Sequence, residues 1–305
     1  MRRRLTMVAT VVITVGVMIV PPLAIAQSRT QTPAVPVKEY RDLEYARVGD
    51  HSLRLDLFVP AAEESPPLVV WIHGGAWMGG DRKWCPLGYL TQEGFAVASI
   101  DYRLVPAVFP AQIHDCKGAI RWLRAHALEY GIRTEKIGVG GDSAGGHLAC
   151  LVGTSGGVAS LEGDIGGHTD QSSTVQAVCD WYGPTDLLTM DTQLPDDPRL
   201  RTHNLPGAPE ARLLGVERVQ EAPEKAAQAS PLTYVDASDP PFLVLHGEKD
   251  PVVPTLQSVQ LTESLCRNNV SLELHLIPDT GHGGPAFDTP RMRQTIRRFF
   301  DRTLR

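Results

Sequence analysis

The chain has 305 residues and is acidic, with 29 Lys and Arg residues against 35 Asp and Glu residues and a formal net charge of −6. Its length and its 42% hydrophobic residues are sufficient for one large buried core. The acidic balance argues against a protein that binds nucleic acid or an anionic membrane through a basic surface.

The first 26 residues have the pattern of a signal peptide. Three arginines follow the first methionine, an apolar run covers 8–20, and Ala24-Ile25-Ala26 is a small-x-small cleavage motif before Gln27. Two prolines interrupt the apolar stretch, which is short for a membrane span of about 20 residues. We therefore expect cleavage before Gln27, a secreted or periplasmic protein without stable membrane association, and a flexible tether over 27–38. The alternative is an uncleaved anchor.

A first buried strand is predicted over 68–72, and it runs into His73-Gly74-Gly75-Ala76-Trp77. Glycines after a strand let a loop turn its N–H groups inward, where they can stabilise a developing negative charge. We therefore expect the N–H groups of Gly74 and Gly75 to contribute to an oxyanion hole. A plain strand-to-loop turn is the alternative.

The segment Gly141-Asp142-Ser143-Ala144-Gly145 is a G-x-S-x-G element. An apolar strand pattern over 136–139 precedes it, and a helical pattern over 147–153 follows it. A sharp strand-to-helix turn of this kind holds a serine hydroxyl clear of the backbone. Ser143 is therefore the candidate nucleophile, and the N–H of Ala144 is a further oxyanion donor. The alternative is a passive serine in a glycine-rich turn.

Two later strands supply candidates for an acid and a base. The strand predicted over 242–245 leads to Asp250, and the strand predicted over 272–277 leads to His282 in a glycine-flanked loop. The order Ser, Asp, His along the chain is that of α/β hydrolases, and all three residues follow strand ends. Asp186, which follows the preceding strand, is the rival acid.

A small lid insertion is expected over 187–233, with a helix near 209–214. Trp77, Trp181 and Tyr182 are candidates for the wall of a substrate pocket, although core packing is an equal alternative for the two tryptophans. The short stretch before the first strand leaves no room for a long N-terminal cap.

The five cysteines form no C-x-x-C pair, and no histidine pair has metal-ligand spacing, so we expect no metal and no cofactor. Cys150 and Cys179 are expected to be small buried hydrophobic side chains. Cys85, Cys116 and Cys266 could contribute one disulfide.

These motifs together resemble those of serine esterases of the α/β-hydrolase superfamily. The nearest branch holds the hormone-sensitive-lipase-like and Bacteroidetes-type feruloyl esterases. Ala76 stands where the lipase-like group has a third glycine, and the form His-Gly-Gly-x-Trp is also similar to that of arylformamidases. The resemblance implies an α/β fold over 39–305, with a mostly parallel sheet and helices on both faces, and the same oxyanion role for Gly74 and Gly75.

We therefore expect an exported serine carboxylesterase that acts on short-acyl or aryl esters, including acetylated or feruloylated polysaccharide. Two alternatives remain at this point. One is an amide hydrolase of the arylformamidase or peptidase type. The other is a non-catalytic binding module, although such modules typically lose the nucleophile or the base. The sequence indicates no oligomeric state.

Overall fold

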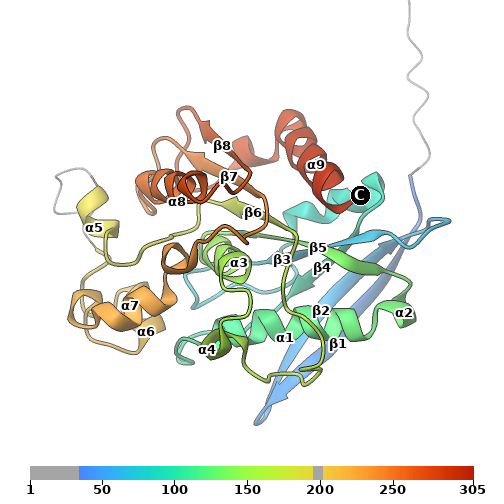
Figure 1. The fold of residues 1–305 in the computed structure, drawn as a ribbon, viewed down its shortest axis with the longest axis horizontal. Helices are drawn as coiled ribbons and strands as arrows, with labels where there is room; N and C mark the ends of the chain where they lie inside the picture. The colour runs from blue at the N-terminus through green and yellow to red at the C-terminus, as the bar shows by residue number, and fades with distance from the viewer. Residues whose placement is uncertain (1–33, 195–201) are drawn as a thin grey trace, which may run out of the picture. The chain divides into compact units, whose positions relative to one another are not determined.

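One sheet runs through the middle of the computed structural model, which describes residues 34–194 and 202–305 (Figure 1). Its strand order is β1-β2-β4-β3-β5-β6-β7-β8. The strands from β4 to β8 in that order are parallel, and β2 pairs antiparallel with both β1 and β4. The predicted mostly parallel α/β sheet is therefore confirmed. The strands are β1 (Val37–Val48), β2 (His51–Pro60), β3 (Pro67–Ile72), β4 (Ala96–Ile100), β5 (Arg133–Asp142), β6 (Ala177–Trp181), β7 (Phe242–Gly247) and β8 (Leu272–Ile277).

Helices connect these strands. The α-helices are α1 (Ala111–Ala125), α2 (Ala127–Tyr130), α3 (Ala144–Thr154), α4 (Ala159–Glu162), α5 (Met190–Gln193), α6 (Pro209–Leu214), α7 (Pro223–Ala229), α8 (Leu256–Arg267) and α9 (Pro290–Leu304). Short 3-10 helices are η1 (Pro86–Glu93), η2 (Val219–Glu221), η3 (Pro231–Tyr234) and η4 (Pro285–Asp288).

Two hydrophobic clusters cover the two faces of the sheet. Side chains alternate across a strand, so Val70 and Ile72 of β3 face one cluster while Val69 and Trp71 face the other. Helices α1, α3 and α8 contribute side chains to the first cluster, as do α6 and α7, and the second cluster includes side chains of η1, η4 and α9. Helices therefore pack on both faces, as predicted.

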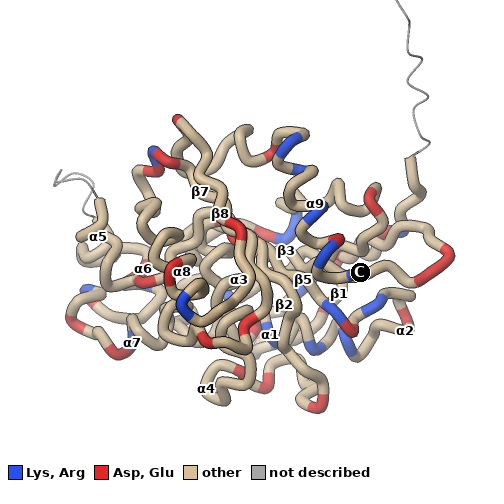
Figure 2. Tube along the Cα trace, turned by 45° about the horizontal axis from the view of Figure 1, so that its top comes forward, with Lys and Arg blue, Asp and Glu red and all other residues tan. Residues whose placement is uncertain are grey.

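Basic and acidic residues are interspersed over the described part of the chain (Figure 2). The arginines of α9 form ion pairs with acidic residues of neighbouring elements. Arg297 pairs with Glu93 of η1 at 2.9 Å, and Arg302 pairs with Glu273 of β8. These exposed pairs add little stability, so the apolar face of α9 accounts for most of its attachment.

The N-terminal region differs in detail from what the sequence predicts. The predicted signal peptide lies outside the described residues, as does most of the predicted tether. Strand β1 begins at Val37, so the last two tether residues belong to the sheet. Val35–Arg305 form one compact unit. Every helix of the described residues is too short or too polar to cross a membrane.

The chain between β6 and β7 carries the helices α5, α6 and α7. In Figure 1, α6 and α7 lie side by side, and α5 lies apart from them and contacts α8. Helix α6 has the bounds predicted for it. Helices α6 and α7 bury Leu213, Leu214 and Ala229 in the first hydrophobic cluster, so part of the predicted lid insertion packs into the core. Residues 195–201 of this segment are not described.

All five cysteines are free thiols. Cys150 of α3 and Cys179 of β6 are fully buried, as expected. Cys116 is buried as well, whereas Cys266 is exposed. The possible disulfide among Cys85, Cys116 and Cys266 is not formed.

Helix α3 crosses β3 at very short range, and Gly145 makes that crossing possible. A Cβ atom at this position would clash with the carbonyl oxygen of Ile72 and lie 2.6 Å from that of His73. Backbone atoms cannot move away without shifting the strand. A glycine is therefore needed at position 145 because any side chain would prevent the close contact between α3 and β3.

We predict that Gly145→Ala lowers the free energy of unfolding by about 2–3 kcal/mol or more, as expected for overpacking against rigid backbone. The matched control is Gly88→Ala in η1, where the new methyl group would lie more than 4 Å from every described residue outside its own stretch of chain. Urea unfolding of the two variants checks the prediction. Equal stability of the two variants would contradict it.

Candidate active site

Ser143 occupies the turn between β5 and α3, with a φ of 53° and a ψ of −118°. A residue other than glycine in such a conformation costs about 1–3 kcal/mol and persists only where its surroundings hold it. The Ser143 N–H donates to Trp181 O at 2.9 Å, and the Ser143 carbonyl accepts from the N–H of His147 at 2.9 Å. The turn is thus tied to β6 and to the first turn of α3, which presents the hydroxyl at the end of the sheet.

The structure brings Ser143, His282 and Asp250 together in one hydrogen-bonded chain. His282 Nε2 lies 2.9 Å from Ser143 Oγ, and His282 Nδ1 lies 2.7 Å from Asp250 Oδ2. An ionised carboxylate only accepts hydrogen bonds, so Nδ1 carries the proton when the ring is neutral. Nε2 is then free to accept the proton of the serine hydroxyl. This is the arrangement of a nucleophile, a general base and an orienting acid.

The Asp250 carboxylate is fully engaged. Its Oδ1 accepts from the N–H groups of Val252 and Val253 at 2.8 and 2.9 Å, and its Oδ2 also lies 3.2 Å from Nε2 of the buried His246. Burial raises the pKa of Asp250, but the hydrogen bonds from His246 and His282 outweigh burial and hold that pKa well below its usual range. Asp250 is therefore ionised whenever His282 acts as a base.

A close approach between two loops places His282. A Cβ atom at Gly247 would collide with the carbonyl oxygens of Thr280 and Gly281, so only glycine lets the histidine loop pass the end of β7. The N–H of Lys249 donates to Thr280 O at 2.9 Å and links the loop of Asp250 to that of His282. The acid and the base, which are 32 positions apart in the sequence, are therefore linked through the backbone of their two loops.

Asp186, the rival acid, serves a local turn. Its carboxylate accepts from the N–H of Leu188 at 3.0 Å and from the hydroxyl of Thr189 at 3.1 Å. Both partners belong to the start of the α5 region. Among the described residues its carboxylate makes no hydrogen bond to a histidine, in contrast to that of Asp250.

The oxyanion loop, residues 73–77, differs in one respect from the prediction. The N–H of Gly74 donates to Asp142 Oδ1 at 2.9 Å, so it is not directed at a substrate. Gly74 cannot carry a side chain, since a Cβ atom would lie 2.6 Å from Asp142 Oδ2. Burial raises the pKa of Asp142 to about 6. The role expected for the Gly74 N–H therefore changes, because this N–H fastens the loop to the serine turn.

The other two expected donors are free. Within the described part of the chain, neither the Gly75 N–H nor the Ala144 N–H donates a hydrogen bond. Gly75 has a φ of 112°, a conformation that favours glycine. The Gly74–Asp142 bond sets this loop beside Ser143. These two N–H groups are therefore positioned to donate hydrogen bonds to an oxygen atom that becomes negatively charged.

The residues proposed for the pocket wall lie in different places. The side chains of Trp77 and Trp181 are buried, with exposures of 2% and 4%, and so cannot form an open wall. Trp181 packs against Trp71 and Phe287, with ring centroids 5.3 and 5.9 Å apart. Tyr182 is buried as well, at 7%, but its ring lies against that of His282, with ring centroids 4.6 Å apart.

Neighbouring polar residues support the site, although they do not join the hydrogen-bonded chain. His73 stacks on Tyr102 with ring centroids 4.5 Å apart, and the Tyr102 hydroxyl donates to His73 O at 3.0 Å. Arg103 pairs with the buried Asp115 at 2.6 Å. The bonds of Asp142 and His246 could not be predicted from the sequence, because spacing along the chain does not reveal contacts across the fold.

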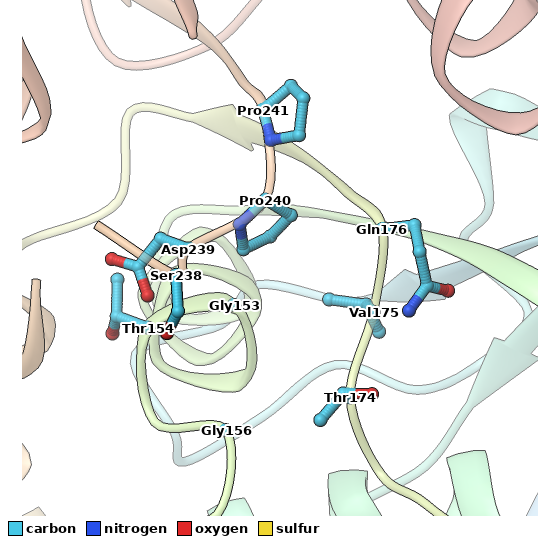
Figure 3. A pocket seen from close by; sticks show the side chains of 10 residues that line it. All are labelled: Gly153, Thr154, Gly156, Thr174, Val175, Gln176, Ser238, Asp239, Pro240 and Pro241. Carbon is cyan, nitrogen blue, oxygen red and sulfur yellow. The ribbon is translucent and has the colours of Figure 1, made fainter. Parts of the chain in front are cut away.

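The hollow drawn in Figure 3 lies at the wrong edge of the sheet for this chemistry. Its volume is about 450 Å³, and Gln176 and Pro241 in its lining precede β6 and β7. The triad follows the carboxyl ends of the strands, at the opposite edge. A second hollow of about 500 Å³ lies beside Asp250. The described residues contain no cluster of side chains suited to a metal ion.

Comparison with known proteins gives concordant matches. The family model described as BD-FAE matches residues 55–265. "Esterase LipC" of Mycobacterium tuberculosis is 33% identical over 234 residues, which are 75% of this chain and 56% of that protein. The chain thus spans only about half the length of the curated relatives that it matches.

Two solved structures are similar over 88% of the chain. The "truncated form of carbohydrate esterase from gut microbiota" has a TM-score of 0.80 and 31% identity, with 97% of that chain covered. The "bifunctional GH43-CE" protein of Bacteroides eggerthii has a TM-score of 0.78 and 36% identity, with 35% of that chain covered.

We predict that Asp250→Asn lowers kcat by about 10⁴, because an asparagine can hold the imidazole in the wrong tautomer. Asp186→Asn is the matched control and should keep most activity, since its carboxylate only caps a turn. Steady-state hydrolysis of a p-nitrophenyl ester by both variants tests this. An inactive Asp186→Asn beside an active Asp250→Asn would reverse the assignment.

The same variant has an effect on acid stability. The pKa of Asp250 is depressed in the folded state, so its contribution is complete above the unfolded-state pKa of about 4 and is lost as the pH falls toward the folded-state pKa. The stability difference between the wild type and Asp250→Asn should therefore shrink below pH 4, by up to about 1.4 kcal/mol per pH unit. A pH-independent difference would show that Asp250 is not the titrating group.

Proposed function

Because this chain belongs to the BD-FAE family of α/β-hydrolase esterases, we propose that it is a serine carboxylesterase that works through an acyl-enzyme. The observation that carries the proposal is the continuous chain of hydrogen bonds from Asp250 through His282 to Ser143. The free N–H groups of Gly75 and Ala144 beside it support the same chemistry.

In acylation, Ser143 Oγ attacks the ester carbonyl carbon while its proton passes to His282 Nε2. The carbonyl oxygen becomes an oxyanion and receives hydrogen bonds from Gly75 and Ala144. Each such donor is worth about 3–4 kcal/mol in the transition state. Asp250 stabilises the imidazolium that forms. The tetrahedral intermediate then collapses, and His282 returns the proton to the leaving alcohol.

In deacylation, water replaces the alcohol and follows the same steps in reverse. His282 removes a proton from the water, and the resulting hydroxide attacks the acyl carbon. The oxyanion forms again at the same two N–H groups. Collapse releases the carboxylic acid, and His282 gives the proton back to Ser143 Oγ.

We further propose short-acyl or aryl esters, including esters on carbohydrate, as the substrate class. One of the two similar solved structures is that of a carbohydrate esterase. Exposed apolar side chains, Met78 and Val252, stand on the loops of the oxyanion donor and of the acid. The hollow beside Asp250, with Leu194 and Leu256 in its lining, supplies additional apolar surface at this edge. These features suit a small apolar acyl or aryl group.

Export is a separate proposal. The arginine-rich start, the apolar run and the Ala24-Ile25-Ala26 motif support removal of residues 1–26 by a signal peptidase. A secreted or periplasmic location would bring the site to esters outside the cytoplasm.

We predict that the wild type hydrolyses p-nitrophenyl acetate and butyrate much faster than the palmitate, and that Ser143→Ala lowers kcat by about 10⁴ or more without unfolding. Methyl ferulate, acetylated xylan, N-formylkynurenine and a dipeptide anilide in the same assay separate an esterase from an amide hydrolase. Faster turnover of either amide would overturn the esterase proposal. A Ser143→Ala variant with wild-type activity would overturn the nucleophile.

If residues 1–26 are removed during export, we predict that the mature protein from its native host starts at Gln27. Intact-mass measurement of the protein from the medium and the periplasm tests this. A full-length species in the membrane fraction would mean that residues 1–26 anchor the protein.

A further inference from the structure

A buried hydrogen-bond chain joins the oxyanion loop to the nucleophile helix. The indole N–H of Trp77 donates to His147 Nδ1 at 3.2 Å, and His147 Nε2 lies 2.6 Å from the carbonyl oxygen of Ala229. A carbonyl only accepts, so Nε2 carries the proton and Nδ1 is the acceptor for the indole. The contacts thus select one neutral tautomer of His147.

His147 remains neutral because its side chain is fully buried, which lowers its pKa to about 4. Protonation would place an N–H on Nδ1 opposite the indole N–H, and two donors cannot bond to each other. The hydrogen bond to Trp77 therefore persists over the pH range in which a histidine base works.

Trp77 needs this support. Ala76 and Trp77 both have positive φ angles, 54° and 57°, although neither is a glycine. A non-glycine residue in this left-handed backbone conformation costs about 1–2 kcal/mol of stability. The loop therefore keeps its shape only where contacts hold it. The Trp77 carbonyl accepts from the N–H of Val105 at 2.9 Å, and the indole is held by His147.

The two residues whose side chains hold the oxyanion loop by hydrogen bonds, Asp142 and His147, lie on either side of Ser143 in the sequence. Asp142 precedes Ser143 and accepts from the N–H of Gly74. His147 follows by one helical turn, and its own N–H donates to Ser143 O. Gly75, whose N–H is free, lies between Gly74 and Trp77. Loss of either hydrogen bond would shift the Gly75 N–H relative to the Ser143 hydroxyl.

We propose that His147 and Trp77 are positioning residues, which hold the Gly75 N–H in register with Ser143 and transmit to it the packing of α7 through Ala229. The expected effect of these residues on kcat rests on the proposed esterase function. The hydrogen bond between them can be tested independently of activity. The chain between β6 and β7 is then a structural support of the oxyanion hole.

The test compares two buried tryptophans, one from each hydrophobic cluster. Trp77→Phe removes the indole N–H that His147 accepts, whereas Trp71→Phe removes a buried indole whose N–H has no partner among the described residues. The two changes delete the same atoms. Trp77→Phe should lower kcat for p-nitrophenyl acetate about tenfold to a hundredfold, the order expected for a misplaced transition-state contact, with KM nearly unchanged. Trp71→Phe should leave kcat near that of the wild type.

Substitutions of His147 separate positioning from packing. His147→Leu should lower kcat as Trp77→Phe does, and combining the two should cost no more than either alone, because both break one link. His147→Gln offers an amide oxygen to the indole and an N–H to Ala229 O, so it should recover most of the lost kcat. Additive losses, or equal effects of Trp77→Phe and Trp71→Phe, would overturn the proposal.

A spectroscopic readout is independent of turnover. In ¹⁵N-labelled protein, His147 should show the Nε2-protonated neutral tautomer, and the indole N–H resonance of Trp77 should shift upfield in His147→Leu. An Nδ1-protonated His147 would exclude the bond to Trp77 even if the enzyme is active. If the wild type hydrolyses no ester while these signals are present, the proposed function fails and the geometry stands.

Discussion

The strained turn at Ser143 is the constraint on which the rest of the site depends. A serine with positive φ is stable only if the strand before it and the helix after it are held rigidly. Here β5 and α3 approach so closely that a Cβ atom at Gly141 would collide with the carbonyl oxygen of Gly145. The hydrogen bonds to β6 and within α3 complete the support. Packing of α3 against the sheet thus provides the free energy that keeps the hydroxyl exposed.

Carboxylates then organise the groups around that hydroxyl. Asp250 holds the His282 tautomer, and its own position is set by two backbone N–H groups and His246. Asp142 performs the equivalent task on the other side, since it fastens the oxyanion loop through Gly74. A buried carboxylate is costly unless it is hydrogen-bonded, so each acid fixes the geometry of its partners.

Much of this arrangement could be predicted from patterns along the chain. The parallel sheet follows from apolar strands that alternate with amphipathic helices, and Ser143, Asp250 and His282 each follow a strand end. Because parallel strands end at one edge of a sheet, that order places the three residues near one another. The predicted role of Gly74 was wrong, and Trp77 and Trp181 are buried. A tryptophan after a strand has the same local pattern whether it faces a core or a pocket.

Local periodicity and short-range glycine patterns suffice to predict the fold class, the nucleophile turn and the order of the catalytic candidates. The free donors and the acid that reaches His282 emerge only when the chain is packed. The same is true of the contact between Trp77 and His147, which are 70 residues apart. Hydrogen bonds have narrow limits of distance and angle, and these limits are met or missed only after the strands and helices pack.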